Sequence, residues 1–231
     1  MDIIGLLPAS GSASRFRGLP KFLLPISANG MTLLEWHIQK LSRICHSIVI
    51  PINPVFQDLV KSLSLPKHVV IEPLSTSTMS ETVLQSLSER SFDACYLRMP
   101  DTFIVGDADS IDGNSFAKNS FCSLEVFPTR PDQVGKLGSV ALDHSSMVTS
   151  IRDKDPSSPL LAHWGAMLFR PKFLSFVENS DAHVGFGARR ALSEGQNIFG
   201  IWHPRADYFD CGTFEEYLRL IARLGSNPSE I

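Results

Sequence analysis

A loop of small residues that carries two cations follows the first apolar segment of the chain, residues 3–7. Its small residues are Ala9, Ser10, Gly11, Ser12, Ala13 and Ser14, and its cations are Arg15 and Lys21. Small side chains let backbone N–H groups approach an anion closely, while Arg and Lys offer positive charge in two different shapes. The pattern therefore favours phosphate binding over its alternative, a plain turn after a strand.

Two aspartates stand where predicted strands end. Asp101 follows residues 94–99, and Asp210 stands between a late strand and the helix predicted over residues 213–224. Because the carboxyl ends of parallel strands meet at one edge of a sheet, we expect both side chains in one crevice. Two such carboxylates suit Mg²⁺, which prefers oxygen ligands and leaves positions for substrate phosphates. The alternative for each aspartate is a turn or a helix cap.

Lys154 is the third candidate, because it follows the strand predicted over residues 147–151. Its alternative is a solvated lysine paired with Asp153 or Asp155, a contact that contributes little to stability. Lys136 and Gly138 are equally well explained as loop residues.

An acidic segment with Asp107, Asp109 and Asp112 offers a second interpretation as a metal site. It is the weaker one, because acidic turns are common and no strand comes directly before it. His163 is the histidine nearest to a suspected site, and a lone histidine there favours packing or hydrogen bonding over catalysis.

Strand and helix patterns alternate over the first hundred residues. Strands are predicted over residues 3–7, 47–52, 69–71 and 94–99, and helices over residues 32–44, 54–63 and 78–87. Thr32 with Glu35 and Thr78 with Glu81 form capping-box patterns at two of the helix starts. Such alternation predicts a mostly parallel sheet with helices on both faces and ligands at the carboxyl ends of the strands.

The regular alternation of predicted strands and helices ends after Asp101. Short strands predicted over residues 121–126, 139–142, 147–151 and 166–169, with polar turns between them, indicate a small antiparallel addition. Helical segments over residues 173–177 and 187–193 and a strand over residues 198–202 follow. The last predicted helix covers residues 213–224 and begins with a third capping-box pattern, Thr213 with Glu216. No repeat, linker or low-complexity tract interrupts the chain, so we expect a single domain over residues 1–231.

Composition narrows the class of protein. With 231 residues, 43% of them hydrophobic and 19% charged, the chain can bury a full core. A net charge of -3 and a pI near 6.2 argue against a broad basic face for nucleic acid, so a nucleotide is the better ligand. No apolar run reaches the length of a membrane span. The four cysteines stand far apart, which favours neither zinc nor disulfides and fits a reducing cytoplasm.

The order of these motifs resembles the nucleotide-sugar pyrophosphorylases, which are sugar-1-phosphate nucleotidyltransferases. That family opens with Leu-Ala-Gly-Gly-x-Gly-Thr-Arg, then Pro-Lys and Leu-Leu-Pro; here these are residues 8–15, then Pro20, Lys21, Leu23, Leu24 and Pro25. Its Gly-Asp matches Pro100 and Asp101, its Glu-Lys-Pro matches Asp153 and Lys154 with Pro156 one residue late, and its Asp-x-Gly-Thr matches Asp210 to Thr213. The matches run in order from residue 3 to about residue 220.

This chain departs from the family pattern at a few positions. Ser10 and Ala13 replace two family glycines, which narrows the phosphate loop, and Thr78 replaces the glycine that faces the base. Pro100 stands in place of the glycine before Asp101. The candidate phosphate and metal residues are all kept, so an active enzyme is the better interpretation.

The resemblance implies an α/β, Rossmann-like fold of the nucleotide-diphospho-sugar transferase type. It also implies a nucleotide-binding half over about residues 1–105 and an acceptor-binding half over about residues 106–231. The reaction would join a nucleoside triphosphate to a sugar 1-phosphate, or a similar phosphorylated alcohol, with release of pyrophosphate.

The resemblance further assigns roles to residues. Arg15 and Lys21 would be the catalytic cations, and Asp101 and Asp210 would hold Mg²⁺. The nucleotide would contact Ala9, Ser10, Gly11, Ser12, Thr78 and Glu81, and the acceptor would contact Lys154, Gly138 and Gly165.

Two other classes of function remain open. A metal-dependent glycosyltransferase of related fold would use an existing nucleotide sugar and hold its metal through Asp107 and Asp109, without needing Arg15 and Lys21. A non-catalytic nucleotide-sensing module would keep the base pocket and lose a metal carboxylate, so the presence of both Asp101 and Asp210 disfavours it.

Overall fold

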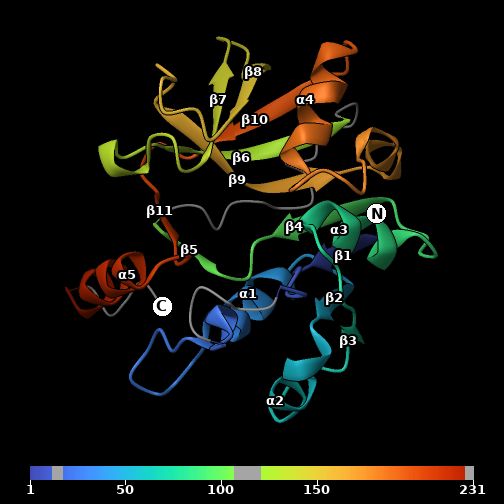
Figure 1. Cartoon of the computed structure of the whole chain (residues 1–231), viewed down its shortest axis with the longest axis vertical. Helices are drawn as coiled ribbons and strands as arrows, with labels where there is room; N and C mark the ends of the chain where they lie inside the picture. The colour runs from blue at the N-terminus through green and yellow to red at the C-terminus, as the bar shows by residue number, and fades with distance from the viewer. Residues whose placement is uncertain (12–17, 107–120, 227–231) are drawn as a thin grey trace.

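The computed structural model describes residues 1–11, 18–106 and 121–226, which are arranged around one mixed sheet (Figure 1). Its main path follows the order β10 (Ile198–Trp202), β6 (Cys122–Pro128), β9 (Ala162–Phe169), β4 (Ala94–Arg98), β1 (Ile3–Leu6), β2 (Ser47–Ile52) and β3 (Val69–Pro73). Strands β4, β1, β2 and β3 are parallel, as are β10 and β6, whereas β9 is antiparallel to both of its neighbours. The predicted mostly parallel sheet is confirmed.

Helices cover both faces of this sheet. Ile4 and Leu6 of β1 belong to a core that includes residues of α3 (Met79–Leu87) and α4 (Gly185–Ser193). Ile3 belongs to a second core, which includes residues of α1 (Leu33–Leu41) and α2 (Gln57–Lys61). Since successive side chains of a strand point to opposite faces, the two cores lie on opposite sides of the sheet, as predicted.

The predicted antiparallel addition is a hairpin of β7 (Gly138–Leu142) and β8 (Val148–Asp153). It joins the sheet where Ser139 pairs with His163 of β9. Figure 1 shows the hairpin at the end of the molecule opposite α2. The two ends of the sheet are therefore built differently, one from parallel strands only and the other from a mixture of parallel and antiparallel strands.

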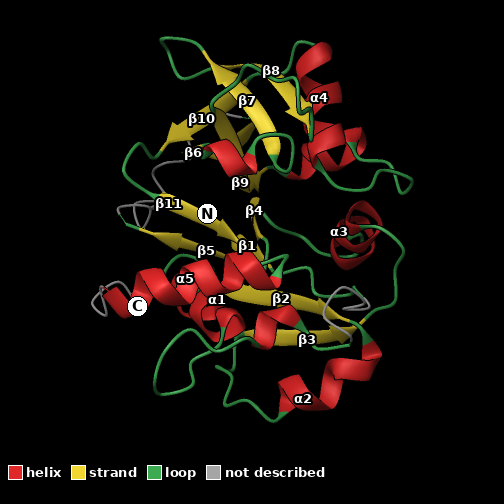
Figure 2. Cartoon of the chain, turned by 60° about the vertical axis from the view of Figure 1, so that its left-hand side comes forward, coloured by secondary structure: helices red, strands yellow, loops and turns green. Residues whose placement is uncertain are grey.

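A second sheet, which the sequence pattern does not predict, is the ribbon of β5 (Thr102–Val105) and β11 (Asp207–Asp210). The two strands are antiparallel, and their register places Asp210 opposite Thr102. Phe103 and Phe209 of the ribbon lie in a third core with residues of α1 and of α5 (Phe214–Ser226). Figures 1 and 2 both show α5 alongside this ribbon. The ribbon thus connects the last helix of the chain to the centre of the molecule.

Helix ends follow the predicted caps in part. At α1 the Thr32 hydroxyl accepts a hydrogen bond from the Glu35 N–H, and the Glu35 carboxylate accepts one from the Thr32 N–H, so this capping box is complete. Thr78 caps α3, but the Glu81 carboxylate accepts from the N–H of Ser77 instead. The second capping box is therefore only half formed.

Two predicted helical segments differ in form. The helix predicted over residues 54–63 is a 3-10 turn (Pro54–Phe56) followed by the short helix α2, because Pro54 favours a tight first turn. The segment predicted over residues 173–177 is a 3-10 helix (Pro171–Phe176). Two further 3-10 turns, Lys21–Leu23 and Pro131–Gln133, carry residues of the site described below.

All four cysteines are buried and unpaired, as the absence of paired spacings predicts. Within the described ranges, no helix is both long enough and apolar enough to cross a membrane.

Candidate active site

Two adjoining cavities lie at the loops that follow the strands. The first has a volume of about 280 Å³ and is lined by residues 8–11 after β1, residues 76–79 after β3 and residues 99–101 after β4. The second, of about 490 Å³, is lined by residues of the hairpin, of β9, of the ribbon and of α5. Both cavities are lined by Lys21, Met79, Met99 and Asp101, so they meet at these four residues.

Neutral hydroxyl groups form one wall of the first cavity. The Ser10 Oγ lies 2.8 Å from the Thr76 Oγ1 and 2.7 Å from the Thr82 Oγ1, and the two threonine oxygens are 2.6 Å apart. Thr82 also donates a hydrogen bond to the Thr78 carbonyl at 2.9 Å. Ser10, which replaces a family glycine, is therefore held by α3 instead of pointing freely into the cavity.

The other predicted nucleotide residues divide into those that reach the first cavity and those that do not. Ala9, Gly11 and Thr78 line it, although the Ala9 N–H donates to the Pro51 carbonyl at 2.8 Å and is committed to the sheet. Any backbone contact to a phosphate must therefore come from the residues after Ala9. Glu81 is not among the residues that line the cavity, because its carboxylate turns to the N–H and hydroxyl of Ser77.

Lys21 and Asp101 lie at the junction of the two cavities. The Lys21 Nζ is 3.5 Å from the Asp101 Oδ2, and the lysine starts the 3-10 turn after Pro20. Asp101 is placed by the turn between β4 and β5. The lysine and the aspartate therefore line the same crevice.

The ribbon brings Asp210 to the same place. Asp210 is the last residue of β11, and the next residue, Cys211, donates its N–H to the Asp101 carbonyl at 2.9 Å. Burial and, next, the negative charge of Asp101 raise the pKa of Asp210 to about 6, against a hydrogen bond from the Gly212 N–H that favours the charged form. A buried carboxylate whose charged form is disfavoured beside a second carboxylate fits a site for a cation.

The described residues contain no cluster of three or more histidine, cysteine, aspartate or glutamate side chains arranged to hold a metal. A metal at the junction would therefore take two protein carboxylates, Asp101 and Asp210, and complete its shell with other oxygens. Mg²⁺ commonly binds in this manner, through one or two carboxylates, water and substrate phosphates. The donor set fits that ion.

Aromatic rings and glycines shape the second cavity. A Cβ on Gly138 would lie 2.3 Å from the Trp164 Nε1, and one on Gly165 would lie 2.4 Å from the Tyr208 Cε2. Both glycines line the cavity, as do the two rings. The predicted acceptor glycines are therefore required by the close approach of Trp164 and Tyr208, whatever else they contact.

Lys154 lines the second cavity from the end of β8. Its two acidic neighbours bind elsewhere: Asp153 contacts His183, and Asp155 contacts Arg152 and Ser157. The surface ion pair that was the alternative interpretation of Lys154 is not formed in the described structure. Its backbone has a φ of 45°, a left-handed conformation that is uncommon for a residue other than glycine.

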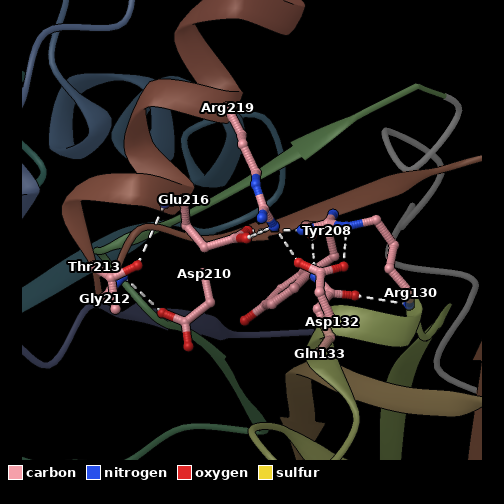
Figure 3. Close-up of polar contacts among 9 residues, drawn as sticks. All are labelled: Arg130, Asp132, Gln133, Tyr208, Asp210, Gly212, Thr213, Glu216 and Arg219. Atoms are coloured by element: carbon pink, nitrogen blue, oxygen red, sulfur yellow. Dashed lines mark hydrogen bonds and ion pairs between the residues drawn. The ribbon is translucent and has the colours of Figure 1, made fainter.

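A network of ion pairs forms the wall of the second cavity next to α5 (Figure 3). Arg130 contacts the Glu216 carboxylate at 2.7 Å, and Arg219 contacts both Glu216 at 2.7 Å and Asp132. Arg130 and Gln133 also donate to the Tyr208 carbonyl, at 2.9 and 2.8 Å. These bonds tie the 3-10 turn Pro131–Gln133 and α5 to β11, which places Asp210 at its end.

The Glu216 carboxylate is thus used in this network and not in the predicted capping box with Thr213. Only the Glu216 N–H contacts the Thr213 hydroxyl, at 3.3 Å. Sequence reasoning missed the network because its members are up to 87 residues apart, as in the pair of Asp132 and Arg219.

His163 lies behind the cavities and not in them. Burial and the charge of Arg130 lower its pKa to about 3, so the ring is neutral, and its Nδ1 lies 3.1 Å from the Thr129 hydroxyl. This agrees with a packing role. Five other candidates, Ser12, Arg15, Asp107, Asp109 and Asp112, lie outside the described residues.

Comparisons with known proteins agree with this geometry. Residues 5–109 match the family model of the MobA-like NTP transferase domain. A UDP-glucose pyrophosphorylase complexed with UDP-glucose superposes with a TM-score of 0.81 and 13% identity, over 98% of this chain and 99% of that one. A putative glucose-1-phosphate thymidylyltransferase from Bacillus anthracis gives a TM-score of 0.82 and 14% identity, over 96% and 94%.

The inositol-1-phosphate CTP transferase from T. maritima gives a TM-score of 0.76 and 13% identity, over 97% of this chain and 96% of that one. No curated protein sequence matches the chain. The resemblance stated from the sequence and the predicted fold class are therefore confirmed: the chain has the fold of these nucleotidyltransferases over almost its whole length, and the domain match covers its first half.

Proposed function

We propose that this protein is a nucleotidyltransferase that joins a nucleoside triphosphate to a sugar 1-phosphate, or to a similar phosphorylated alcohol, and releases pyrophosphate. The observation that supports this most is the meeting of two cavities at Lys21 and Asp101, with Asp210 beside them. One cavity for each substrate and one charged junction between them is the arrangement that such a transfer needs.

In the proposed reaction an oxygen of the acceptor phosphate attacks the α-phosphorus of the triphosphate. A new phosphorus–oxygen bond forms, the bond between the α-phosphorus and the bridging oxygen of the β-phosphate breaks, and pyrophosphate leaves with that electron pair. No covalent bond to the protein is required, so the work of the protein is to position the two substrates and to neutralise charge.

The residues divide this work according to the cavities. The triphosphate occupies the first cavity, where Gly11 approaches the phosphates and Thr76 to Thr78 surround the base. The Lys21 ammonium neutralises charge that grows at the α-phosphoryl group, and Arg15 holds the departing pyrophosphate. The acceptor occupies the second cavity, with its phosphate on Lys154.

Asp101 and Asp210 hold Mg²⁺ in this proposal. When bound, the ion supplies positive charge that neutralises the reacting phosphates. The two carboxylates contribute by their placement, because the turn before β5 and the end of β11 bring them to the same place.

We also infer that the protein works in the reducing cytoplasm. Four buried cysteines without a disulfide support this, since oxidising compartments favour paired thiols.

A pyrophosphate-release screen tests the function. Four or five nucleoside triphosphates are combined with a panel of sugar 1-phosphates and phosphorylated alcohols in the presence of Mg²⁺. We expect release with one acceptor class, and we expect the isolated product to regenerate the triphosphate when pyrophosphate is added. His144→Ala is the matched control, because His144 is an exposed residue of the turn between β7 and β8.

The same screen distinguishes the glycosyltransferase alternative. Transfer of a sugar from a nucleotide sugar, lost in Asp107→Ala and unaffected by Lys21→Ala, would contradict the proposal. Binding of a nucleotide without any turnover in either assay would instead favour a nucleotide-sensing module.

A further inference from the structure

A histidine that the sequence did not single out lies in the second cavity beside Lys154. The His183 Nε2 is 2.8 Å from the Asp153 Oδ1, and both side chains line the cavity. Asp153 ends β8, whereas His183 comes just before α4, so the bond joins the hairpin to that helix. The two side chains are only 22% and 17% exposed.

The hydrogen bonds of His183 determine which of its ring nitrogens carries the proton. The Gly185 N–H donates to the His183 Nδ1 at 3.1 Å, so the Nδ1 is an acceptor and has no proton of its own. The Nε2 of the neutral ring is then the N–H that donates to the Asp153 carboxylate. Each polar atom of the ring therefore has one defined partner.

Packing fixes the plane of the same ring. Its centroid lies 4.9 Å from that of Phe186 and 6.2 Å from that of Trp164. A Cβ on Gly185 would lie 2.8 Å from the His183 Nδ1, so only a glycine allows the N–H to approach the ring this closely. The imidazole is held on two sides by aromatic rings and at both nitrogens by hydrogen bonds.

Asp153 is in turn held on its backbone side. It pairs with Gly138 in the β7–β8 ladder, and Gly138 lies against Trp164. Asp153 is thus fixed at its backbone by the strand and at its carboxylate by His183. The peptide that follows it therefore has little conformational freedom. That peptide leads into Lys154, whose left-handed backbone costs free energy and persists only where its surroundings impose it.

We propose that Asp153 and His183 are a positioning pair that holds Lys154 in its left-handed conformation, so that its ammonium group stays in the second cavity for an anion of the acceptor. This inference rests on the proposed function for the identity of that anion, a phosphate ester. It adds that the acceptor site depends on α4 as well as on the hairpin. Neither residue touches the reacting atoms in this account, so both act through Lys154.

Two substitutions of His183 separate this role from mere packing. In His183→Gln the side-chain amide reaches the position of the Nε2 and can still donate to Asp153. In His183→Asn the shorter amide keeps the acceptor for the Gly185 N–H and loses the bond to Asp153. We expect the KM for the acceptor to rise about ten-fold in His183→Asn and to return close to the wild-type value in His183→Gln.

The KM for the triphosphate should change less than about two-fold in both variants, because the first cavity does not include His183. His144→Ala is again the control and should leave both KM values unchanged. Acceptor KM values that are equal in His183→Asn, His183→Gln and the wild type would overturn the proposal. An equal rise in the KM for both substrates would also overturn it, because that result indicates a general loss of structure.

Asp153→Ala provides an independent route if His183→Asn does not fold. It should raise the KM for the acceptor to a similar extent, and the double variant His183→Asn/Asp153→Ala should be no worse than either single variant, because the two side chains act as a unit. Independent, additive effects of the two substitutions would contradict a pair.

The proposed function and the pair can fail separately. If the wild type transfers no nucleotidyl group to any acceptor, the proposed function fails. The pair is then tested with inorganic phosphate as the probe, by calorimetry. The same order of affinities, wild type and His183→Gln above His183→Asn, supports the pair, and equal affinities overturn it.

Discussion

The two cavities of this protein differ in how their walls are held. In the first cavity the wall next to α3 consists of hydroxyl groups that bind one another, Ser10, Thr76 and Thr82. In the second cavity the wall next to α5 contains the charged side chains of Asp132, Glu216 and Arg219, which are paired with one another or with Arg130. A neutral wall suits a base and a charged one suits a polar acceptor, which supports the proposal that the first cavity takes the nucleotide and the second takes the acceptor.

The difference has its origin in the sheet. The first cavity lies where parallel strands end, so its residues come from short loops that follow β1, β3 and β4. The second cavity is lined by residues of the hairpin, the ribbon and α5, which are brought together by contacts between distant parts of the chain. Lys21 and Asp101, at the junction, line both cavities.

Substitution of the junction carboxylates is expected to have the largest effect. Asp101→Asn and Asp210→Asn should each lower turnover by orders of magnitude, on the order of 10²-fold or more, because one lost charge weakens the metal site. The melting temperature should change little in either variant, because asparagine has nearly the same volume. Steady-state rates over a range of Mg²⁺ concentrations measure the effect. Rates near the wild-type value with normal Mg²⁺ dependence in both variants would contradict the assignment.

Replacement of a glycine by alanine should lower the free energy of unfolding in the second cavity and leave it nearly unchanged in the first. Gly165→Ala should lower the free energy of unfolding by about 1–3 kcal/mol, because its Cβ would lie 2.4 Å from the Tyr208 ring. Gly11→Ala, in the first cavity, should change it by less than about 0.5 kcal/mol, because no described residue lies within 4 Å of the added Cβ. Denaturant unfolding of both variants gives the comparison, and equal losses would show that the rings are not what excludes a side chain at Gly165.

The residues of the first cavity could be predicted from the sequence better than those of the second. Alternating strands and helices predict the parallel sheet, and ligands bind at the carboxyl ends of such strands, so Lys21 and Asp101 could be placed in one crevice. Asp210 also lines the second cavity, at the end of a strand that the sequence analysis did not predict. The four residues of β11 are too few for a periodic pattern, and their partner β5 is about a hundred residues away.

The residues that line the second cavity could not be predicted from the sequence in the same way. His183 is a lone histidine in the sequence, and its partner Asp153 is 30 residues distant, so no local pattern marks the pair. Glu216 stands three residues after Thr213 and fits a capping box, but two arginines compete for its carboxylate in the folded chain. The partners of a charged side chain are the oppositely charged groups near it in the folded chain. Spacing along the sequence does not show which groups these are.

A buried acid where the two halves of the sheet meet should produce a smaller, pH-dependent effect. Glu125 of β6 accepts a hydrogen bond from the Tyr96 hydroxyl of β4, and burial raises the pKa of its carboxyl group from 4.5 to about 8. The folded chain therefore binds this proton more tightly than the unfolded chain. The resulting stabilisation is complete below the unfolded pKa of 4.5 and is lost as the pH rises through about 8.

Glu125→Gln removes this proton equilibrium while it keeps an oxygen that accepts from Tyr96. The free energy of unfolding of the wild type, relative to this variant, should fall steadily as the pH rises from 4.5 to 8. Denaturant unfolding at several pH values measures the difference. A difference that stays constant over this range would show that Glu125 does not carry a raised pKa.

The most direct test of the account compares the affinities of the two substrates in one variant, Lys154→Ala. Lys154 lines the second cavity and not the first, so its removal should weaken the binding of the acceptor phosphate alone. We predict that the KM for the acceptor rises about ten-fold or more, while the Kd of the triphosphate, measured by calorimetry, stays within about two-fold of the wild-type value. Equal weakening of both ligands would contradict the separation of the two cavities, and no change in either would return Lys154 to the role of a solvated surface residue.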